Sequence, residues 1–269
     1  MNLRQLGFLF TTASTATLVY GALVEANRLV VERRWLSLPH WPERLNGFKI
    51  ALLADFHLRD EYSVALGKRA VALALDENPD FVVLAGDYVG YWKPASPWML
   101  GEVLSPLAGM EGAVVAVPGN HDYWSGDASL LIPIFDELNI KLLRNEVWTR
   151  SGIEWVGIDS ANAKRADPVR TMSLANSNHP KVVVWHEPDV VDWLPSGGSI
   201  MLSGHSHGGQ FTLPWGWTPI HTKNGERYVQ GFFPDAPTPL YVSRGIGTTG
   251  PPARLGCTPE VAILELFSQ

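Results

Sequence analysis

One stretch, IMLSGHSHGGQ at residues 200–210, places His205 and His207 two positions apart directly after an apolar run. In an extended chain, side chains at positions i and i+2 point to the same side, so the two imidazoles can converge on one point. Neutral imidazole is the most common metal ligand among protein side chains. The stretch therefore predicts a strand that ends in a metal site, with further ligands supplied from elsewhere in the chain.

Four other apolar runs also end in side chains that bind metals. Asp55 and His57 follow residues 48–53 and repeat the spacing of the first pair. The other candidates are Asp87 after residues 81–84, Asn120, His121 and Asp122 after residues 113–117, and His186 after residues 181–185. Taken alone, each is more often a turn residue or a satisfied polar group than a ligand. Together they lie at the carboxyl ends of expected strands, where open α/β sheets build their sites.

The composition favours one large domain and argues against two classes of protein. The chain has 269 residues, a net charge of −6 and only 21 lysines and arginines, so we expect no broad basic face and no nucleic-acid partner. The single cysteine, Cys257, excludes an internal disulfide and with it a small disulfide-stapled scaffold. The oligomeric state stays open.

The N-terminal segment contains 20 consecutive uncharged residues, 5–24, about the length of a helix that spans a bilayer core. We predict that residues 1–27 form a membrane anchor or signal-anchor. A cleaved secretory peptide and a peripheral amphipathic helix are the alternatives, because hydroxyl side chains interrupt the apolar run. Residues 28–47 are then a linker and residues 48–269 the folded domain. More arginines follow the segment than precede it, which favours a single-pass protein of the cell inner membrane with a cytoplasmic domain; a periplasmic domain is the alternative.

Apolar runs alternate with helical patterns up to residue 140, which is typical of an α/β fold. The predicted helices cover residues 64–76, 97–107 and 128–138. Beyond residue 140, closely spaced short runs predict a second sheet packed on the first. Its strands are expected at residues 141–143, 147–150, 154–158, 181–185, 200–202, 228–230, 240–243 and 261–267.

The motifs together resemble the five-part signature of the calcineurin-like metallophosphoesterases, in the order that this family shows. They are Asp55-Phe56-His57, Gly86-Asp87, Gly119-Asn120-His121-Asp122, His186 and Gly204-His205-Ser206-His207, within residues 48–267. The tail YVSRGIG at residues 241–247, with Pro259-Glu260, also resembles a membrane-anchored bacterial phosphodiesterase branch that includes UDP-2,3-diacylglucosamine pyrophosphatases. The resemblance implies an α/β fold, a four-layer αββα sandwich of two mixed β-sheets with flanking helices and a dinuclear metal site at the strand ends.

The same resemblance implies a role for each motif residue. Asp55, His57 and His207 would hold one divalent ion, Asn120, His186 and His205 the other, and Asp87 would bridge them. Mixed nitrogen and oxygen ligands suit Mn, Fe, Zn or Co. A metal-bridging hydroxide would attack phosphorus. His121 would be the catalytic residue at the leaving oxygen, and Asp122 would set its tautomer and raise its pKa.

The expected activity is metal-dependent hydrolysis of a phosphodiester or pyrophosphate bond; a phosphomonoesterase and a non-catalytic metal-binding scaffold are the alternatives. Aromatic residues follow the metal-bearing segments, among them Trp215 and Trp217. They either form an interfacial rim for a lipid-linked substrate or pack the two sheets together. Arg244 and Arg254 are candidates for a grip on phosphate, with surface salt bridges as the alternative. Gln210 either supports a ligand or is an ordinary strand residue.

Overall fold

Two β-sheets form the centre of the computed structural model, which describes residues 15–175 and 178–269. Within these residues the first sheet has six strands in the order β1-β12-β2-β3-β4-β5. The strands are β1 (Val30–Leu38), β12 (Glu260–Ser268), β2 (Phe48–Leu53), β3 (Phe81–Leu84), β4 (Val114–Ala116) and β5 (Lys141–Leu142). Strand β12 is antiparallel to β2, whereas β2, β3 and β4 run in parallel. The carboxyl ends of β2, β3 and β4 therefore meet at one edge of the sheet.

The second sheet, within the same described residues, has the strand order β10-β11-β9-β8-β7-β6. Its strands are β6 (Glu146–Arg150), β7 (Ile153–Ile158), β8 (Lys181–Trp185), β9 (Ile200–Ser203), β10 (Gly231–Phe233) and β11 (Leu240–Val242). Because β7, β8, β9 and β11 pair in parallel, the carboxyl ends of β8 and β9 also lie side by side.

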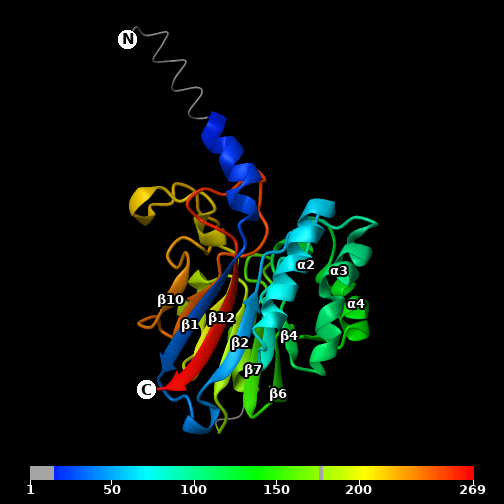
Figure 1. Cartoon of the computed structure of the whole chain (residues 1–269). Helices are drawn as coiled ribbons and strands as arrows, with labels where there is room; N and C mark the ends of the chain where they lie inside the picture. The colour runs from blue at the N-terminus through cyan, green and yellow to red at the C-terminus, as the bar shows by residue number, and fades with distance from the viewer. Residues whose placement is uncertain (1–14, 176–177) are drawn as a thin grey trace.

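A buried core lies between the sheets, and helices cover their outer faces (Figure 1). Alternate side chains of β2 point to opposite faces: Ile50 and Leu52 pack between the sheets, while Ala51 and Leu53 pack under helices. Phe81 and Trp155 stack across the two sheets, with ring centroids 3.9 Å apart. The helices are α2 (Glu61–Asp76), α3 (Ser96–Leu104) and α4 (Ile132–Glu137) on the first sheet, and α5 (Pro168–Ser173) on the second. The predicted α/β fold of two mixed sheets with flanking helices is confirmed.

The prediction of a linker at residues 28–47 is wrong, because most of this segment belongs to the folded domain. Strand β1 pairs in parallel with β12 from Val30 opposite Glu260 to Leu38 opposite Ser268. Leu38 is buried between the two sheets. Pro39, Trp41 and Pro42 made the segment look like a linker, but they follow the strand, and charged side chains such as Arg33 and Arg34 are usual on an edge strand.

The second half of the chain also differs from its prediction in strand pairing. Strands β5 and β12 join the first sheet, although the sequence placed both in the second. Strand β12 is buried on both faces along most of its length, which fits its place between β1 and β2. The strand predicted at residues 228–230 instead spans Gly231–Phe233.

The N-terminal segment is described only in part. Residues 5–14 of the predicted anchor lie outside the described residues, and residues 15–23 are helical. Among the described residues, no helix combines the length and the apolar character needed to cross a bilayer. The membrane anchor stays a prediction.

Candidate metal centre

The seven predicted metal ligands lie just beyond the carboxyl ends of five strands. Asp55 and His57 follow β2, Asp87 follows β3, Asn120 follows β4, His186 follows β8, and His205 and His207 follow β9. Five of them have a left-handed backbone, with φ between 46° and 72°: Asp55, His57, Asp87, His205 and His207. Residues with a Cβ rarely adopt this conformation, and it accumulates at functional sites. The chain thus turns sharply after each strand and presents consecutive ligands from a tight loop.

His205 and His207 do not converge on one point. The prediction that they would was wrong, because it assumed an extended backbone at these residues. Their left-handed backbones separate the two rings, and each ring joins a different cluster. His207 lies with Asp55 and His57, and His205 lies with Asp87 and His186. The ligand atoms within each cluster lie within 4.8 Å of one another.

The first cluster brings together side chains from both sheets. His57 Nε2 lies 3.0 Å from His207 Nε2, and Asp55 Oδ1 lies 3.5 Å from His207 Nε2 and 3.9 Å from His57 Nε2. All three side chains are buried. When both rings carry their proton on Nδ1, the two facing Nε2 atoms present lone pairs to one point, which is the arrangement that binds a shared cation.

The second cluster adjoins the first through Asp87. His186 Nε2 lies 3.2 Å from His205 Nδ1 and 3.2 Å from Asp87 Oδ2. The same Asp87 oxygen lies 3.5 Å from His57 Nε2 in the first cluster. Asp87 therefore occupies the position of a carboxylate that can bind two cations at once.

Orphaned polar atoms support a metal in this position. Asn120 Oδ1 is buried and has no hydrogen-bond partner among the described residues, and the same holds for His207 Nδ1. A buried polar atom without a partner carries a cost of about 1–3 kcal/mol, which ligation of a cation by Asn120 would remove. Imidazole nitrogens with carboxylate and amide oxygens form a donor set for Mn, Fe, Zn or Co. The residues present therefore fit a pair of divalent ions.

The electrostatics of the first cluster favour metal binding, whereas His186 in the second cluster has a raised pKa. Burial lowers the pKa of His57 to about 3, and burial with the neighbouring His57 and Arg254 charges holds the pKa of His207 well below its usual range. Burial also raises the pKa of Asp55 to about 7. For His186, burial alone would lower the pKa, but the Asp87 carboxylate outweighs it and raises the pKa. Neutral imidazoles are the form that binds metals, and a cation among them would favour the ionised form of Asp55.

His121 lies at the margin of the clusters. Its Nδ1 is 3.0 Å from the Gly90 carbonyl oxygen, so Nδ1–H donates to that oxygen and Nε2 is free for substrate. The His121 ring packs edge to face against two other rings. Its centroid lies 4.6 Å from that of His57 and 4.2 Å from that of Trp124. The His121 backbone N–H also donates to Asp87 Oδ1 over 2.8 Å.

The Asp122 carboxylate contacts backbone N–H groups, whereas the sequence predicted a contact with the His121 ring. Its carboxylate accepts backbone N–H groups of Gly119 at 2.8 Å, Tyr88 at 3.0 Å and Asp87 at 3.1 Å. The Gly90 carbonyl, and not Asp122, holds the His121 ring. Asp122 is therefore a positioning residue that ties the Asp87 and Asn120 loops together.

Sequence reasoning missed the supports around His205. The Lys223 carbonyl oxygen lies 2.8 Å from His205 Nε2 and also accepts a hydrogen bond from Asn162 Nδ2 over 2.9 Å. The buried Glu187 carboxylate fixes the Asn162 segment by accepting N–H groups of Ala161 at 3.1 Å and Asn162 at 3.0 Å. The position of Glu187 directly after His186 was an available signal, whereas nothing in the sequence marked Asn162.

The three residues left open by the sequence all have structural partners. Arg254 is fully buried and donates to the carbonyl oxygens of Gly247 at 2.6 Å and His207 at 3.2 Å, so it does not face a substrate. Arg244 pairs with Glu260 at 2.7 Å. The Gln210 amide donates to the Thr249 carbonyl at 2.9 Å and accepts from the Thr249 N–H at 3.0 Å, and so joins two loops.

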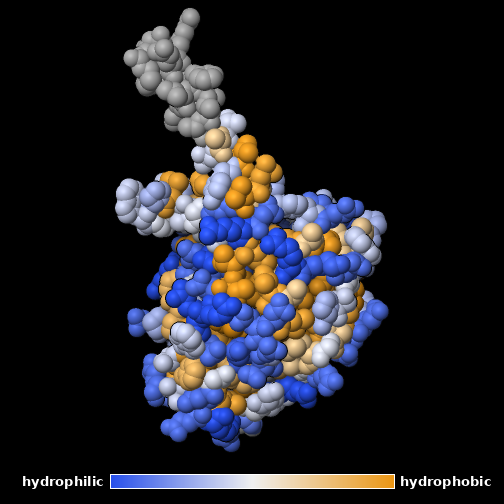
Figure 2. Space-filling view, in the orientation of Figure 1, coloured by the Kyte–Doolittle hydropathy of each residue, from blue (hydrophilic) through white to orange (hydrophobic). Residues whose placement is uncertain are grey.

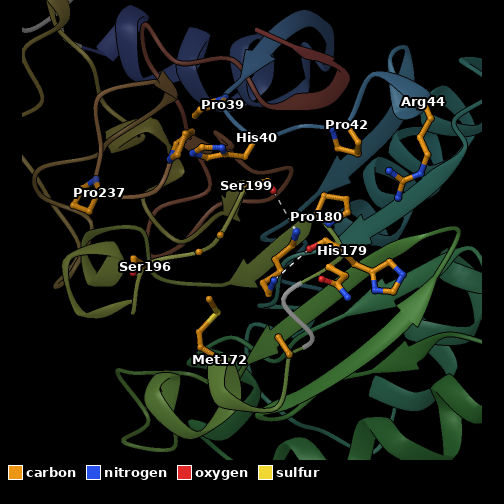
Figure 3. Close-up of a pocket in the computed structure, with 16 residues that line it drawn as sticks. Pro39, His40, Pro42, Arg44, Met172, His179, Pro180, Ser196, Ser199 and Pro237 are labelled. Atoms are coloured by element: carbon orange, nitrogen blue, oxygen red, sulfur yellow. Dashed lines mark hydrogen bonds between the residues drawn. The ribbon is translucent and has the colours of Figure 1, made fainter.

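Two cavities lie at opposite ends of the sheets. A recess of about 370 Å³ adjoins the clusters and is lined by Asn120, Tyr123, Trp124, Asn162 and Arg165 among others, so it can receive a substrate next to the ligands. A larger cavity, of about 720 Å³, is lined by His40, Arg44, His179 and Lys181 among others (Figure 3). Lys181 begins β8, whereas His186 follows its end, so this cavity is remote from the clusters.

The chain is similar to known metallophosphoesterases. The profile of the family described as calcineurin-like phosphoesterase matches residues 48–209. Phosphodiesterase YaeI of Escherichia coli is 32% identical over 226 residues, covering 81% of this chain and 82% of that protein. UDP-2,3-diacylglucosamine pyrophosphatase LpxG of Chlamydia trachomatis is 27% identical over 295 residues, covering 87% of this chain and 88% of that protein. Among solved structures, a dimetal phosphatase from Danio rerio covers 75% of this chain and 88% of its own, with 12% identity and a TM-score of 0.48.

Proposed function

The chain belongs to the calcineurin-like metallophosphoesterase family, and we propose that it hydrolyses a phosphodiester or pyrophosphate bond in a lipid-linked substrate. The observation that carries the hydrolytic part is the pair of adjoining buried clusters that share Asp87. Relatives named as a phosphodiesterase and as pyrophosphatases of a diacylated sugar nucleotide support the choice of bond and the lipid.

In this proposal each motif residue has one task. Asp55, His57 and His207 would hold one divalent ion, Asn120, His186 and His205 would hold the other, and Asp87 would serve both. When bound, the ions supply the Lewis acidity that polarises a phosphoryl group and activates water. His121 donates a proton from Nε2 to the leaving oxygen, while its Nδ1–H stays on the Gly90 carbonyl. The Lys223 carbonyl keeps the His205 ring in place, and Asn162, fixed by Glu187, donates to the same carbonyl.

Metal reconstitution tests this function directly. The protein is stripped with a chelator, reloaded separately with Mn, Zn, Fe, Co or Mg, and assayed on bis-p-nitrophenyl phosphate, p-nitrophenyl phosphate and an acylated sugar-nucleotide pyrophosphate in micelles. We expect at least one transition metal to restore turnover, with the diester or the lipid pyrophosphate preferred over the monoester. His179→Ala, in the remote cavity of Figure 3, is the control that keeps full activity.

The other outcomes identify the competing functions. A preference for the monoester would favour a phosphomonoesterase. Two bound metals without turnover of any of the three substrates would favour a metal-binding scaffold. A preference for the soluble diester over the lipid pyrophosphate would keep the hydrolase and reject the lipid-linked substrate.

We also propose that the N-terminal segment holds the protein at the cell inner membrane, with the folded domain on the cytoplasmic side. The uncharged run at residues 5–24 and the arginines that follow it support this location. Protease treatment of right-side-out and inverted membrane vesicles tests it: only the inverted vesicles should expose the domain. Release of the protein into the soluble fraction would contradict the anchor.

A further inference from the structure

One loop, residues 211–222, begins and ends at the candidate metal centre; we call it the Trp loop. It follows the short helix η7 (His207–Gly209) and Gln210. At its far end, the carbonyl oxygen of Lys223 lies 2.8 Å from His205 Nε2. Thr218 packs so closely on Gly209 that a Cβ added at this glycine would lie 2.3 Å from its methyl group. The base of the loop is thus fixed to the segment that carries two ligands.

The tip of the Trp loop exposes large apolar side chains to solvent. Trp215 is 99% exposed, and Trp217 and Ile220 are each 62% exposed. The Leu213 N–H donates to the Trp217 carbonyl over 2.8 Å, which closes a tight turn with Trp215 at its end. Tryptophan is highly buried on average in soluble proteins, so a fully exposed one beside another marks a contact surface.

A second apolar element stands at the same end of the molecule. The helix at residues 15–23 exposes Leu18 by 62% and Leu23 by 70%. The helix and the Trp loop are joined through residues 254–255. The Gly21 carbonyl of the helix accepts a hydrogen bond from the Arg254 N–H at 3.1 Å, and the Leu255 carbonyl accepts one from the Thr212 N–H of the Trp loop at 2.7 Å. Figure 1 shows the helix and the loop at one end of the sheets, and Figure 2 shows the apolar side chains on the helix.

We propose that this end of the protein docks on a lipid bilayer, with Trp215 and Trp217 inserted among the headgroups next to the N-terminal helix. The bilayer is favoured over a protein partner for two reasons. The uncharged sequence continues through residues 5–14 upstream of the exposed helix, and tryptophan concentrates at membrane interfaces. Exposed Lys223 at the base of the loop adds a positive charge on the side of anionic headgroups.

Docking in this orientation turns the metal centre toward the lipid surface. The Trp loop is fixed at both ends to the His205–His207 segment, so docking of its tip brings these two ligands close to the lipid surface. This part of the inference rests on the proposed function, because only a lipid-linked substrate would gain from it. The docking itself needs no turnover and can be measured separately.

Flotation of the full chain with vesicles tests the docking. Wild type, Trp215→Ser, Trp217→Ser and the double variant are mixed with vesicles of phosphatidylcholine, alone or with an equal amount of phosphatidylglycerol, and are centrifuged through a density gradient. Bound protein floats and aggregates sink. We expect wild type to float, more with phosphatidylglycerol. Vesicles that contain a brominated phosphatidylcholine should quench the tryptophan fluorescence of wild type much more than that of the double variant, because the quencher lies in the bilayer next to the two inserted indoles. Trp35→Ser is the matched control, since Trp35 is 74% exposed, between Trp217 and Trp215, but lies on β1.

The outcomes separate docking from catalysis. Equal quenching of the double variant and wild type, or no flotation of wild type, would overturn the proposal. So would a wild-type dimer without vesicles that the double variant loses in sedimentation velocity, because the surface would then bind a second copy. All variants should hydrolyse a soluble diester at the wild-type rate, so failure of the hydrolase proposal would be visible in that assay alone.

Discussion

His121 is held in a way that defines which of its nitrogens can act. Since Nδ1 is engaged with the Gly90 carbonyl at 3.0 Å, only Nε2 can meet a substrate. A potential ligand atom of His121 also lies within 4.8 Å of those of His57 and Asp87, so the ring borders the clusters without belonging to the predicted ligand set. This placement suits a proton donor to the leaving oxygen.

His121→Ala should therefore slow hydrolysis in a way that depends on the leaving group. We expect a loss of about 10²–10⁴-fold for a substrate with an alkoxide leaving group. The loss should be much smaller for bis-p-nitrophenyl phosphate, because p-nitrophenolate leaves without a proton. Steady-state rates on both substrates, with metal content by mass spectrometry, check this. An equal loss on both, accompanied by loss of metal, would make His121 a ligand instead.

Asp122 accepts its hydrogen bonds from the backbone of the loops that carry the metal ligands. Replacing it with asparagine puts an NH₂ group among three backbone N–H donors, where the carboxylate accepts from Gly119, Tyr88 and Asp87. We expect Asp122→Asn to lower the free energy of unfolding by about 1–3 kcal/mol for each donor left unpaired, and to lower metal content. Urea titration measures the first effect. The exposed Asp235, changed to asparagine, is the control and should change nothing.

At the scale of elements, β1 decides whether residues 28–47 belong to the fold. Leu38 is fully buried between the sheets, whereas Trp35 on the same strand is 74% exposed. Leu38→Ala should lower the free energy of unfolding by about 2–5 kcal/mol, and Trp35→Ala by much less. Denaturant unfolding of both variants measures the difference. A linker would tolerate both changes equally. If neither variant changed the midpoint of denaturant unfolding, β1 would not be part of the folded domain.

The success and the failure of the sequence predictions have separate physical causes. The strands β2, β3, β8 and β9 and their ligands were predictable, because a buried strand that ends in Asp or His carries its signal locally. The sheet membership of β5 and β12 was not, since apolar texture identifies a strand but not its pairing partner. The contacts of Asp122 and the burial of Arg254 were not predictable either, because both depend on backbone groups that only folding brings together.

At the scale of the whole molecule, the candidate metal centre joins the two sheets. Asp55, His57, Asp87 and Asn120 come from the first sheet, and His186, His205 and His207 come from the second. In the first cluster, His207 of the second sheet faces His57 of the first across 3.0 Å. Ions bound here would link the sheets at the edge where their parallel strands end, so metal binding should stabilise the whole fold.

Metal removal should accordingly lower the melting temperature of the full domain. A ligand present at about 100 times its Kd stabilises the folded state by about 2.7 kcal/mol, which in a domain of this size corresponds to roughly 5–10 °C. Calorimetry of loaded and chelator-treated protein measures the shift. Asp87→Asn keeps the shape of the side chain and removes the charge that both cations would share, so the shift should shrink strongly in this variant. Equal melting temperatures for the loaded and stripped wild type, or a shift that survives intact in Asp87→Asn, would place the metals elsewhere.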